Sequence, residues 1–206
     1  MSGRGSNLAA LLDAVAAARS AEVALVLSNK AEAGALTLAR SQGIPAEVLT
    51  NPADGAEWIE RLTTRRIDLV VLAGYLKLVP KAVVEAWSGR ILNIHPALLP
   101  RHGGPGMYGR RVHEAVLAAG EAESGATVHL VDEVYDRGTT LAQARVPVLP
   151  GDTPDTLAAR VLAVEHRLLP AAVLAAAESG RPVPFVPGPD VTESWRSHAE
   201  SADQRQ

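Results

Sequence analysis

The stretch that decides the fold reads Ile91-Leu92-Asn93-Ile94-His95-Pro96-Ala97-Leu98-Leu99-Pro100. Its first half is almost continuously apolar, as expected for a strand that is buried on both sides of a parallel sheet. The proline at position 96 ends such a strand because it cannot donate a ladder hydrogen bond. Asn93 and His95 lie two residues apart, so on a strand their side chains point to the same face. The stretch therefore predicts a buried strand whose carboxyl end presents an amide and an imidazole.

Short apolar runs of this kind alternate with longer helical patterns along the chain. The alternation predicts an α/β fold with a doubly wound, mostly parallel sheet of Rossmann-like type and helices on both faces. Strands are expected at Glu22–Leu27, Ala46–Leu49, Leu69–Leu72, Ile91–Ile94, Ala126–Leu130 and Ala142–Pro147. Helices are expected at Asn7–Ala18, Ala31–Gln42, Ala56–Arg65, Lys81–Trp87, Gly109–Ala118 and Pro154–Ser179.

The composition limits the possible classes of protein. With 206 residues, 47% hydrophobic and 21% charged, the chain fits one globular domain, which we assign to residues 1–180. Residues 181–206 are Pro-rich and then polar, and are expected to form an extended, flexible tail. The net charge of -3 gives no reason to expect a nucleic-acid partner, and the absence of cysteine excludes disulfides, thiolate metal ligands and a cysteine nucleophile.

Targeting features are not evident in the sequence. No apolar run reaches the ~18 residues of a membrane span, and the start has no apolar signal-peptide region. We therefore expect a cytoplasmic protein that does not associate with membranes. The sequence leaves open whether it is a monomer or a homodimer.

A glycine-rich loop, Gly3-Arg4-Gly5-Ser6-Asn7, leads directly into the first helical pattern. Such a loop can hold a phosphate on backbone amides at a helix N-terminus, although Gly-Ser-Asn is also an ordinary way to begin a helix. A phosphate loop of this type normally follows a buried strand, yet only Met1 and Ser2 precede it. We therefore expect that the first strand of the sheet is missing from the given sequence and that translation begins upstream.

The residues Asn93, His95 and Asp136 suggest chemistry at a carbonyl group. An amide can donate to a developing oxyanion, and an imidazole oriented by a carboxylate can move a proton near neutral pH. Each of the three residues alone has an ordinary structural explanation, as a turn former or a hydrogen-bonded buried group. The other histidines show no spacing typical of metal ligands, so no metal is expected.

Four sequence blocks together resemble the phosphoribosylglycinamide formyltransferases, folate-dependent enzymes of purine synthesis. The blocks are Gly5-Ser6-Asn7-Leu8, Val70-Val71-Leu72-Ala73-Gly74-Tyr75-Leu76-Lys77-Leu78, Leu92-Asn93-Ile94-His95-Pro96-Ala97-Leu98-Leu99-Pro100 and Gly125-Ala126-Thr127-Val128-His129-Leu130-Val131. The resemblance extends over roughly residues 2–180. It implies direct transfer of a formyl group from 10-formyltetrahydrofolate, as co-substrate, to the amine of 5-phosphoribosylglycinamide.

The resemblance also implies roles for individual residues. Asn93, His95 and Asp136 would be the catalytic trio, with Asn93 and a protonated His95 stabilising the oxyanion and Asp136 favouring the protonated form. The implied substrate contacts are Gly5, Ser6 and Asn7 for the phosphate, and Glu165 for the ribose hydroxyls. The implied folate contacts, largely through backbone groups, are Leu76, Lys77, Leu78, Val79, Asp132, Glu133, Val134 and Tyr135.

Two features depart from the family pattern, and other functions stay open. Arg137 stands where many members have glycine, and the segment 101–109 is longer than in the short family form. Formyltetrahydrofolate hydrolase and methionyl-tRNA formyltransferase use the same Asn-x-His and Asp chemistry, but each would carry a further domain for which this sequence leaves no room. A non-catalytic nucleotide-binding module would explain the glycine loop but not the trio.

Overall fold

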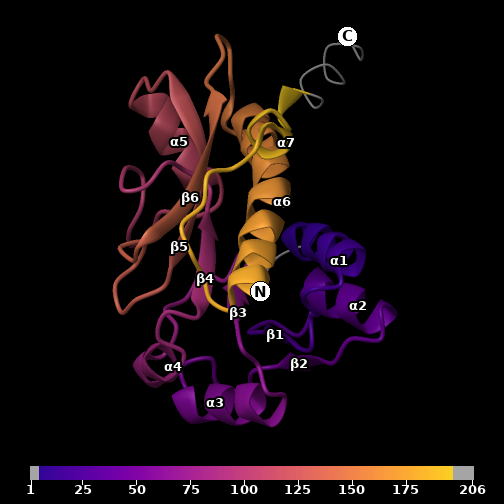
Figure 1. The fold of residues 1–206 in the computed structure, drawn as a ribbon. Coiled ribbons are helices and arrows are strands. Elements are labelled where there is room, and N and C mark those ends of the chain that lie inside the picture. The colour runs from indigo at the N-terminus through magenta and orange to yellow at the C-terminus, as the bar shows by residue number, and fades with distance from the viewer. Residues whose placement is uncertain (1–4, 197–206) are drawn as a thin grey trace.

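The computed structural model describes residues 5–196. Its helices are α1 (Ser6–Ala18), α2 (Gly34–Ser41), α3 (Gly55–Thr64), α4 (Lys81–Ala86), α5 (Arg110–Ala118), α6 (Pro154–Ser179) and α7 (Pro189–Thr192). Its strands are β1 (Val26–Ser28), β2 (Ala46–Val48), β3 (Val70–Leu72), β4 (Ile91–His95), β5 (Glu123–Leu130) and β6 (Thr140–Pro147). The predicted α/β fold with helices on both sides of the sheet is confirmed (Figure 1).

The strands form two separate sheets in the described part of the chain. One contains β1 and β2 in parallel, and the other has the order β3-β4-β5-β6. In the larger sheet β3 and β4 are parallel, whereas β5 runs antiparallel to both β4 and β6. The pairing is therefore more mixed than the mostly parallel sheet expected from sequence, because β5 runs opposite to β4 after α5 and the chain then returns directly from β5 to form β6.

The core is arranged around the long helix α6, which packs against β5, β6, α1 and α5 (Figure 1). Leu157, Val161 and Leu168 of this helix are fully buried in the largest hydrophobic cluster. Thr153 caps α6 by accepting a hydrogen bond from the Thr156 N–H, which starts the helix at the predicted residue. Two smaller clusters lie elsewhere, one between α3, α4 and β3, the other between α2, β1 and β2.

The segment after α6 lies against the domain as far as it is described. Residues 181–188 form no helix or strand, but the Phe185 N–H donates to the Leu141 carbonyl at 3.0 Å. The short helix α7, which the sequence patterns did not predict, buries Val191. The expected flexible tail also includes residues 197–206, which lie outside the described residues. The division at residue 180 remains a prediction.

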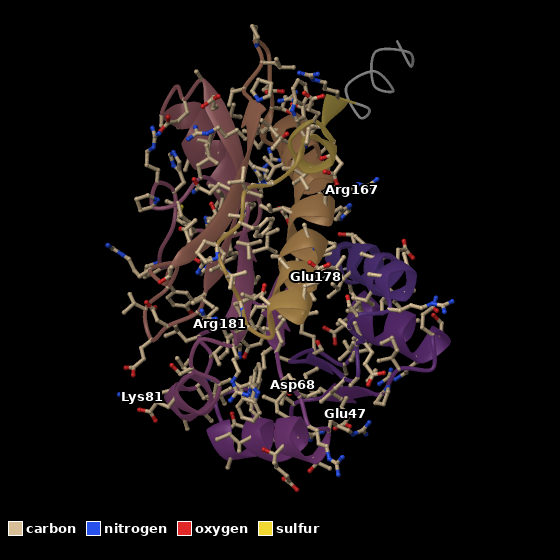
Figure 2. All side chains as sticks on the ribbon, viewed as in Figure 1. Glu47, Asp68, Lys81, Arg167, Glu178 and Arg181 are labelled. Carbon is tan, nitrogen blue, oxygen red and sulfur yellow. The ribbon has the colours of Figure 1, made fainter. Side chains whose placement is uncertain are left out.

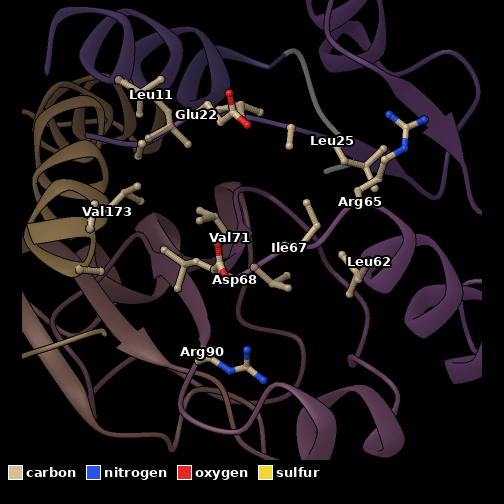
Figure 3. Close-up of a pocket in the computed structure, with 18 of the residues that line it drawn as sticks. Leu11, Glu22, Leu25, Leu62, Arg65, Ile67, Asp68, Val71, Arg90 and Val173 are labelled. Carbon is tan, nitrogen blue, oxygen red and sulfur yellow. The ribbon is translucent and has the colours of Figure 1, made fainter. Parts of the chain in front are cut away.

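A cavity of about 1000 Å³ lies between the two sheets (Figure 3). Residues from β1 and β3 line it together with residues from α1, α3 and α6. The expected missing strand would precede residue 5, and residues 1–4 lie outside the described range. Between residues 5 and 196, no helix has the length and apolar character needed to cross a membrane.

Candidate active site

The candidate site is built on the carboxyl end of β4. Asn93 and His95 lie on the same face of this strand, as the two-residue spacing predicted, and the strand ends at His95, just before Pro96. The antiparallel register places His129 of β5 directly opposite Asn93. The two side chains are hydrogen-bonded, with 3.1 Å between Asn93 Nδ2 and His129 Nε2. His129 of the neighbouring strand therefore belongs to the same cluster of side chains as Asn93.

Asp136 reaches this group from the loop between β5 and β6. Its backbone has a φ of 56°, in the left-handed region that few residues other than glycine, asparagine and aspartate adopt. Gly138 closes the loop against the Leu130 carbonyl, where a Cβ would lie 1.8 Å from the oxygen. The Gly104 N–H also donates to Asp136 Oδ2 at 2.9 Å. Backbone contacts that require glycine thus fix the position of this carboxylate.

The carboxylate of Asp136 lies between two imidazoles. Its Oδ2 is 3.5 Å from His95 Nδ1, and its Oδ1 is 3.5 Å from His129 Nε2. The structure therefore brings together the three predicted residues Asn93, His95 and Asp136, and adds His129 between them. Both imidazoles are almost completely buried, with 3% and 2% of the residue surface exposed for His95 and His129. We refer to these four residues as the polar cluster.

The electrostatics of His95 combine two opposing effects. Burial lowers the pKa of His95 and outweighs the nearby Asp136 carboxylate, which acts to raise it. The sequence analysis foresaw the effect of Asp136 but not the larger effect of burial, so the unliganded ring favours the neutral form. Its Nε2 lies 2.8 Å from the His102 carbonyl oxygen, which can only accept, so Nε2 carries the proton of the neutral ring. Nδ1 is then the basic nitrogen, and it faces Asp136.

Asp136 stays ionised in this environment. Burial acts to raise the pKa of Asp136, but the His129 and His95 rings and the Gly104 N–H together outweigh burial and lower it. His129 Nδ1 donates to the Leu130 carbonyl oxygen at 2.8 Å, which turns Nε2 of the ring toward Asn93 and Asp136. The cluster thus combines a fixed negative charge, a basic imidazole nitrogen and an oriented amide.

The predicted phosphate loop and Glu165 also meet. The Asn7 side-chain N–H donates to Glu165 Oε2 at 2.8 Å, which links the first turn of α1 to the middle of α6. Glu165 is 8% exposed, and its burial raises its pKa to about 7. Asn7 Oδ1 is buried without a hydrogen-bond partner among the described residues. This pair therefore holds unused hydrogen-bonding capacity.

Gly5 is required for the way in which α1 begins. It is the N-cap residue, with φ at 89°, and a Cβ at this position would lie 2.9 Å from the Ala35 Cα of α2. A larger residue would therefore push the two helices apart at their N-terminal ends. Ser6 is the first residue of α1 and is exposed. Gly3 and Arg4 of the same loop lie outside the described residues.

The two segments predicted to contact a folate are neighbours in space. Lys81, which begins α4 shortly after the first segment and is labelled in Figure 2, forms an ion pair with Glu133 of the second, with 3.1 Å between Lys81 Nζ and Glu133 Oε1. Leu76 and Leu78 before α4 are 47% and 48% exposed, and Val134 in the facing loop is 58% exposed. The remaining predicted contacts differ in exposure: Lys77 is exposed, Val79 is buried, and Asp132 and Tyr135 are intermediate.

The sequence reasoning missed His129 and the glycines that hold Asp136. His129 lies in the block Gly125–Val131, which was used only for the resemblance. Its position on the predicted strand Ala126–Leu130 was the signal that could have identified it. Gly103 offered no comparable signal, because its close approach to Asp136 exists only after folding: a Cβ at Gly103 would lie 3.1 Å from the Asp136 Cβ.

These features define an α/β protein of the Rossmann-like class, with its polar cluster at the carboxyl end of a buried strand, where ligands bind in open α/β sheets. Residues 1–173 match the family model described as formyl transferase. The chain therefore belongs to the formyl transferase family. Within residues 5–196, no group of three histidine, cysteine or acidic side chains is arranged to hold a metal ion.

Relatives of known name agree with this membership. The chain is 46% identical over 176 residues to the chloroplastic phosphoribosylglycinamide formyltransferase of Arabidopsis thaliana, covering 82% of this chain and 60% of that protein. It is 40% identical over 177 residues to the phosphoribosylglycinamide formyltransferase of Escherichia coli K12, covering 82% and 81%. The chain thus spans about 60% of the length of the plant relative and most of the bacterial one.

Solved structures show the same fold. Glycinamide ribonucleotide transformylase 1 from Symbiobacterium toebii matches with a TM-score of 0.81 and 39% identity, over 91% of this chain and 92% of that one. Phosphoribosylglycinamide formyltransferase from Anaplasma phagocytophilum matches with a TM-score of 0.79 and 40% identity, over 87% and 85%. A formyltetrahydrofolate deformylase from Pseudomonas syringae matches with a TM-score of 0.77 at 25% identity, over 87% and 60%.

Proposed function

We propose that this protein transfers the formyl group of 10-formyltetrahydrofolate to the amine of 5-phosphoribosylglycinamide, in the purine biosynthesis of the cytoplasm. The observation that carries the proposal is the contact of Asp136 with both His95 and His129 beside Asn93. Formyl transfer needs a donor for an oxyanion and a group that moves a proton, and these residue types supply both. The names of the relatives support the choice of substrates.

The ribonucleotide would bind at the start of α1. Its phosphate would lie on the Gly5–Asn7 turn, where the first backbone amides of α1 point outward without helical partners. Glu165, already hydrogen-bonded to Asn7, would accept hydrogen bonds from the ribose hydroxyls. The raised pKa of Glu165 supports this role, because hydroxyl donors would stabilise the carboxylate that burial disfavours.

The folate would bind between the segment Leu76–Val79 and the loop Asp132–Tyr135. Leu76, Leu78 and Val134 expose apolar side chains from these two facing segments. Exposed apolar groups on neighbouring segments suit a flat aromatic ring system such as a pterin, and the nearby backbone groups can supply its hydrogen bonds. Arg137, which is exposed at the end of this loop, would add a positive charge near the glutamate tail of the folate.

The reaction would proceed by direct attack of the amine on the formyl carbon. A C–N bond forms while the carbonyl electron pair moves onto oxygen, and Asn93 donates a hydrogen bond to this oxyanion. Collapse of the tetrahedral intermediate restores the C=O bond and breaks the bond from carbon to N10 of the folate. The proton lost by the amine ends on N10, and His95 Nδ1 is the basic nitrogen that can carry it.

The charge state of His95 would change during this step. The neutral ring favoured by burial can take a proton from the attacking amine, whereas a permanently charged ring could not. Asp136 then stabilises the imidazolium, because its carboxylate lies 3.5 Å from Nδ1. Burial lowers the pKa of His95 and Asp136 acts to raise it, and this balance suits a group that must both accept and release a proton.

One assay distinguishes this function from its nearest rival, hydrolysis of the formyl folate. Purified protein is mixed with 10-formyltetrahydrofolate, with and without glycinamide ribonucleotide, and tetrahydrofolate formation is followed by absorbance. We expect product only when the ribonucleotide is present, together with formylated ribonucleotide in equal amount. Tetrahydrofolate and free formate produced without the ribonucleotide would indicate a hydrolase, and no turnover in either mixture would indicate a non-catalytic binding module.

A further inference from the structure

His95 lies between two groups that compete for the single proton of its neutral ring. On one side Nε2 is 2.8 Å from the His102 carbonyl oxygen, and on the other Nδ1 is 3.5 Å from Asp136 Oδ2. The carboxylate is the stronger acceptor of the two, so the shorter distance to the carbonyl is what keeps the proton on Nε2. The position of the His102 carbonyl therefore decides which nitrogen of His95 is basic.

The side chain of Glu121 holds the loop that carries this carbonyl. The backbone of His102 has a φ of 56°, in the left-handed region that few residues other than glycine adopt without support from their surroundings. His102 Nε2 lies 3.2 Å from Glu121 Oε1, and Arg101 Nη1 donates to Glu121 Oε2 at 2.7 Å. One carboxylate thus binds two consecutive residues of the loop, one through each oxygen.

The backbone of Glu121 is itself fixed by the end of α5. Gly120 follows the helix in the left-handed conformation, with a φ of 63°, and its N–H donates to the Leu117 carbonyl at 3.1 Å. The Glu121 N–H donates to the Val116 carbonyl at 3.4 Å, which completes a Schellman motif. Val116 is fully buried in the largest hydrophobic cluster. Glu121 is therefore anchored to the core, and the loop is anchored to Glu121.

The two partners of Glu121 differ in how far they are shielded from water. The side chains of His102 and Glu121 are 16% and 21% exposed, whereas that of Arg101 is 66% exposed. A polar contact is stronger where water is largely excluded, and an exposed ion pair contributes little. The contact with His102 is therefore the one through which Glu121 acts on the loop.

We propose that Glu121 is a positioning residue that holds the His102 carbonyl against Nε2 of His95 and so keeps Nδ1 free to accept a proton. Without Glu121 the loop relaxes and the carbonyl moves away from Nε2. The proton then passes to Nδ1, where the Asp136 carboxylate accepts its hydrogen bond, and the basic nitrogen is on the wrong side of the ring. The consequence for turnover rests on the proposed function, whereas the tautomer of His95 does not depend on it.

The test measures the tautomer of His95 and the kinetic constants in variants of Glu121. At a pH where the ring is neutral, the ¹⁵N chemical shifts of its two nitrogens show which one carries the proton. We expect the Nε2–H form in the parent and a mixture with the Nδ1–H form in Glu121→Ala. In the same variant kcat should fall about 10-fold with both KM values within about twofold, since small misplacements of a reacting group mainly lower turnover. Glu121→Gln, which keeps an oxygen that accepts from His102, should restore the parental tautomer and kcat.

Arg101→Ala is the matched control for Glu121→Ala. It removes the exposed partner of Glu121 and leaves the contact with His102 intact, so the tautomer of His95 and kcat should stay parental. An unchanged His95 tautomer in Glu121→Ala would overturn the proposal. The same loss of kcat in Arg101→Ala would also overturn it, because the effect would then come from the ion pair.

A double variant tests whether Glu121 acts through His102. His102→Asn removes the ring that Glu121 binds but keeps a residue that adopts the left-handed conformation readily. Adding Glu121→Ala to His102→Asn should therefore cause no further change in kcat or in the tautomer of His95. A full additional loss would contradict the proposal. If the parent transfers no formyl group, the proposed function fails, and the tautomer comparison alone decides the role of Glu121.

Discussion

The polar cluster on β4 and the cavity beside β3 differ in how completely they are built. In the cluster, Asn93, His95, His129 and Asp136 are in contact and anchored by backbone groups. In the cavity, aliphatic side chains surround about 1000 Å³ between two strand edges. The comparison teaches that adjacent paired strands hold the four side chains of the cluster in contact, whereas the edges of β1 and β3, which belong to different sheets, leave a space between them.

The largest effect is expected from removing the amide of the cluster. Asn93→Ala should lower kcat for formyl transfer by about 10²–10³-fold, as loss of an oxyanion donor does, with a much smaller change in KM. Steady-state kinetics with both substrates measures this split. Asn51→Ala is the matched control, because the Asn51 side chain only closes an exposed turn by accepting from the Ala53 N–H. A variant with normal kcat and raised KM would show that Asn93 only positions substrate.

The loop that carries Asp136 should be nearly as sensitive. In Gly138→Ala the new Cβ would lie 1.8 Å from the Leu130 carbonyl oxygen, so the loop must move and take Asp136 with it. We expect most of the activity to be lost, with the free energy of unfolding lowered by about 1–3 kcal/mol, as overpacking does. Gly43→Ala is the control, because alanine strains the backbone there, at a φ of 72°, while its Cβ meets nothing within 4 Å and leaves the Asp136 loop in place. Equal activity in the two variants would mean that the reaction does not depend on the position of Asp136.

Glu165 should make stability depend on pH in the direction opposite to an ordinary carboxylate. Burial raises its pKa from 4.5 to about 7, so the unfolded chain ionises first and stability falls as pH rises from 4.5 through 7. Glu165→Gln should therefore gain about 2–3 kcal/mol relative to the parent between pH 5 and pH 8. Urea unfolding at the two pH values measures this gain. A pH-independent difference would mean that Glu165 has the same pKa in the folded and unfolded protein, so that burial does not raise it.

A smaller effect is expected at His113, a buried residue of α5 outside the cluster. Burial lowers its pKa to about 4, and its Nδ1 has no hydrogen-bond partner in the described structure. The unfolded chain takes up a proton near pH 6.5, so this group reduces stability as pH falls from 6.5 toward 4. His113→Leu should remove about 2 kcal/mol of the loss between pH 7 and pH 5. An unchanged loss in urea unfolding would contradict this assignment.

The sequence predicted the regular elements well where local signals mark their ends. For α6 both bounds, Pro154 and Ser179, were predicted, because a threonine cap precedes the helix and Gly180 in the left-handed conformation follows it. The strand expected at Glu22–Leu27 was less well predicted, since β1 pairs only at Val26–Ser28. Its hydrophobic pattern is that of a strand with two neighbours, and in the described structure it pairs only with β2.

For the site, the sequence identified groups within one strand but not contacts between distant segments. The spacing of Asn93 and His95 fixed their common face, because strand alternation is a local property. Asp136 was named as a candidate by its residue type, but its contact with the two histidines could not be predicted, since its approach depends on a left-handed backbone and on the close packing of Gly138. The neutral state favoured for His95 could not be predicted either, because burial is a result of the whole fold.

The most direct test of the central claim is to separate binding from chemistry at His95. His95→Gln keeps a side chain that can donate to the His102 carbonyl but cannot carry a proton at Nδ1. Calorimetric titration with glycinamide ribonucleotide and formyl-transfer kinetics are measured on this variant, with His113→Leu as the histidine control. We predict that His95→Gln binds the ribonucleotide within about twofold of the parent while kcat falls about 10²–10⁴-fold, the usual contribution of general acid-base catalysis. Unchanged kcat, or affinity lost in proportion to activity, would contradict the account.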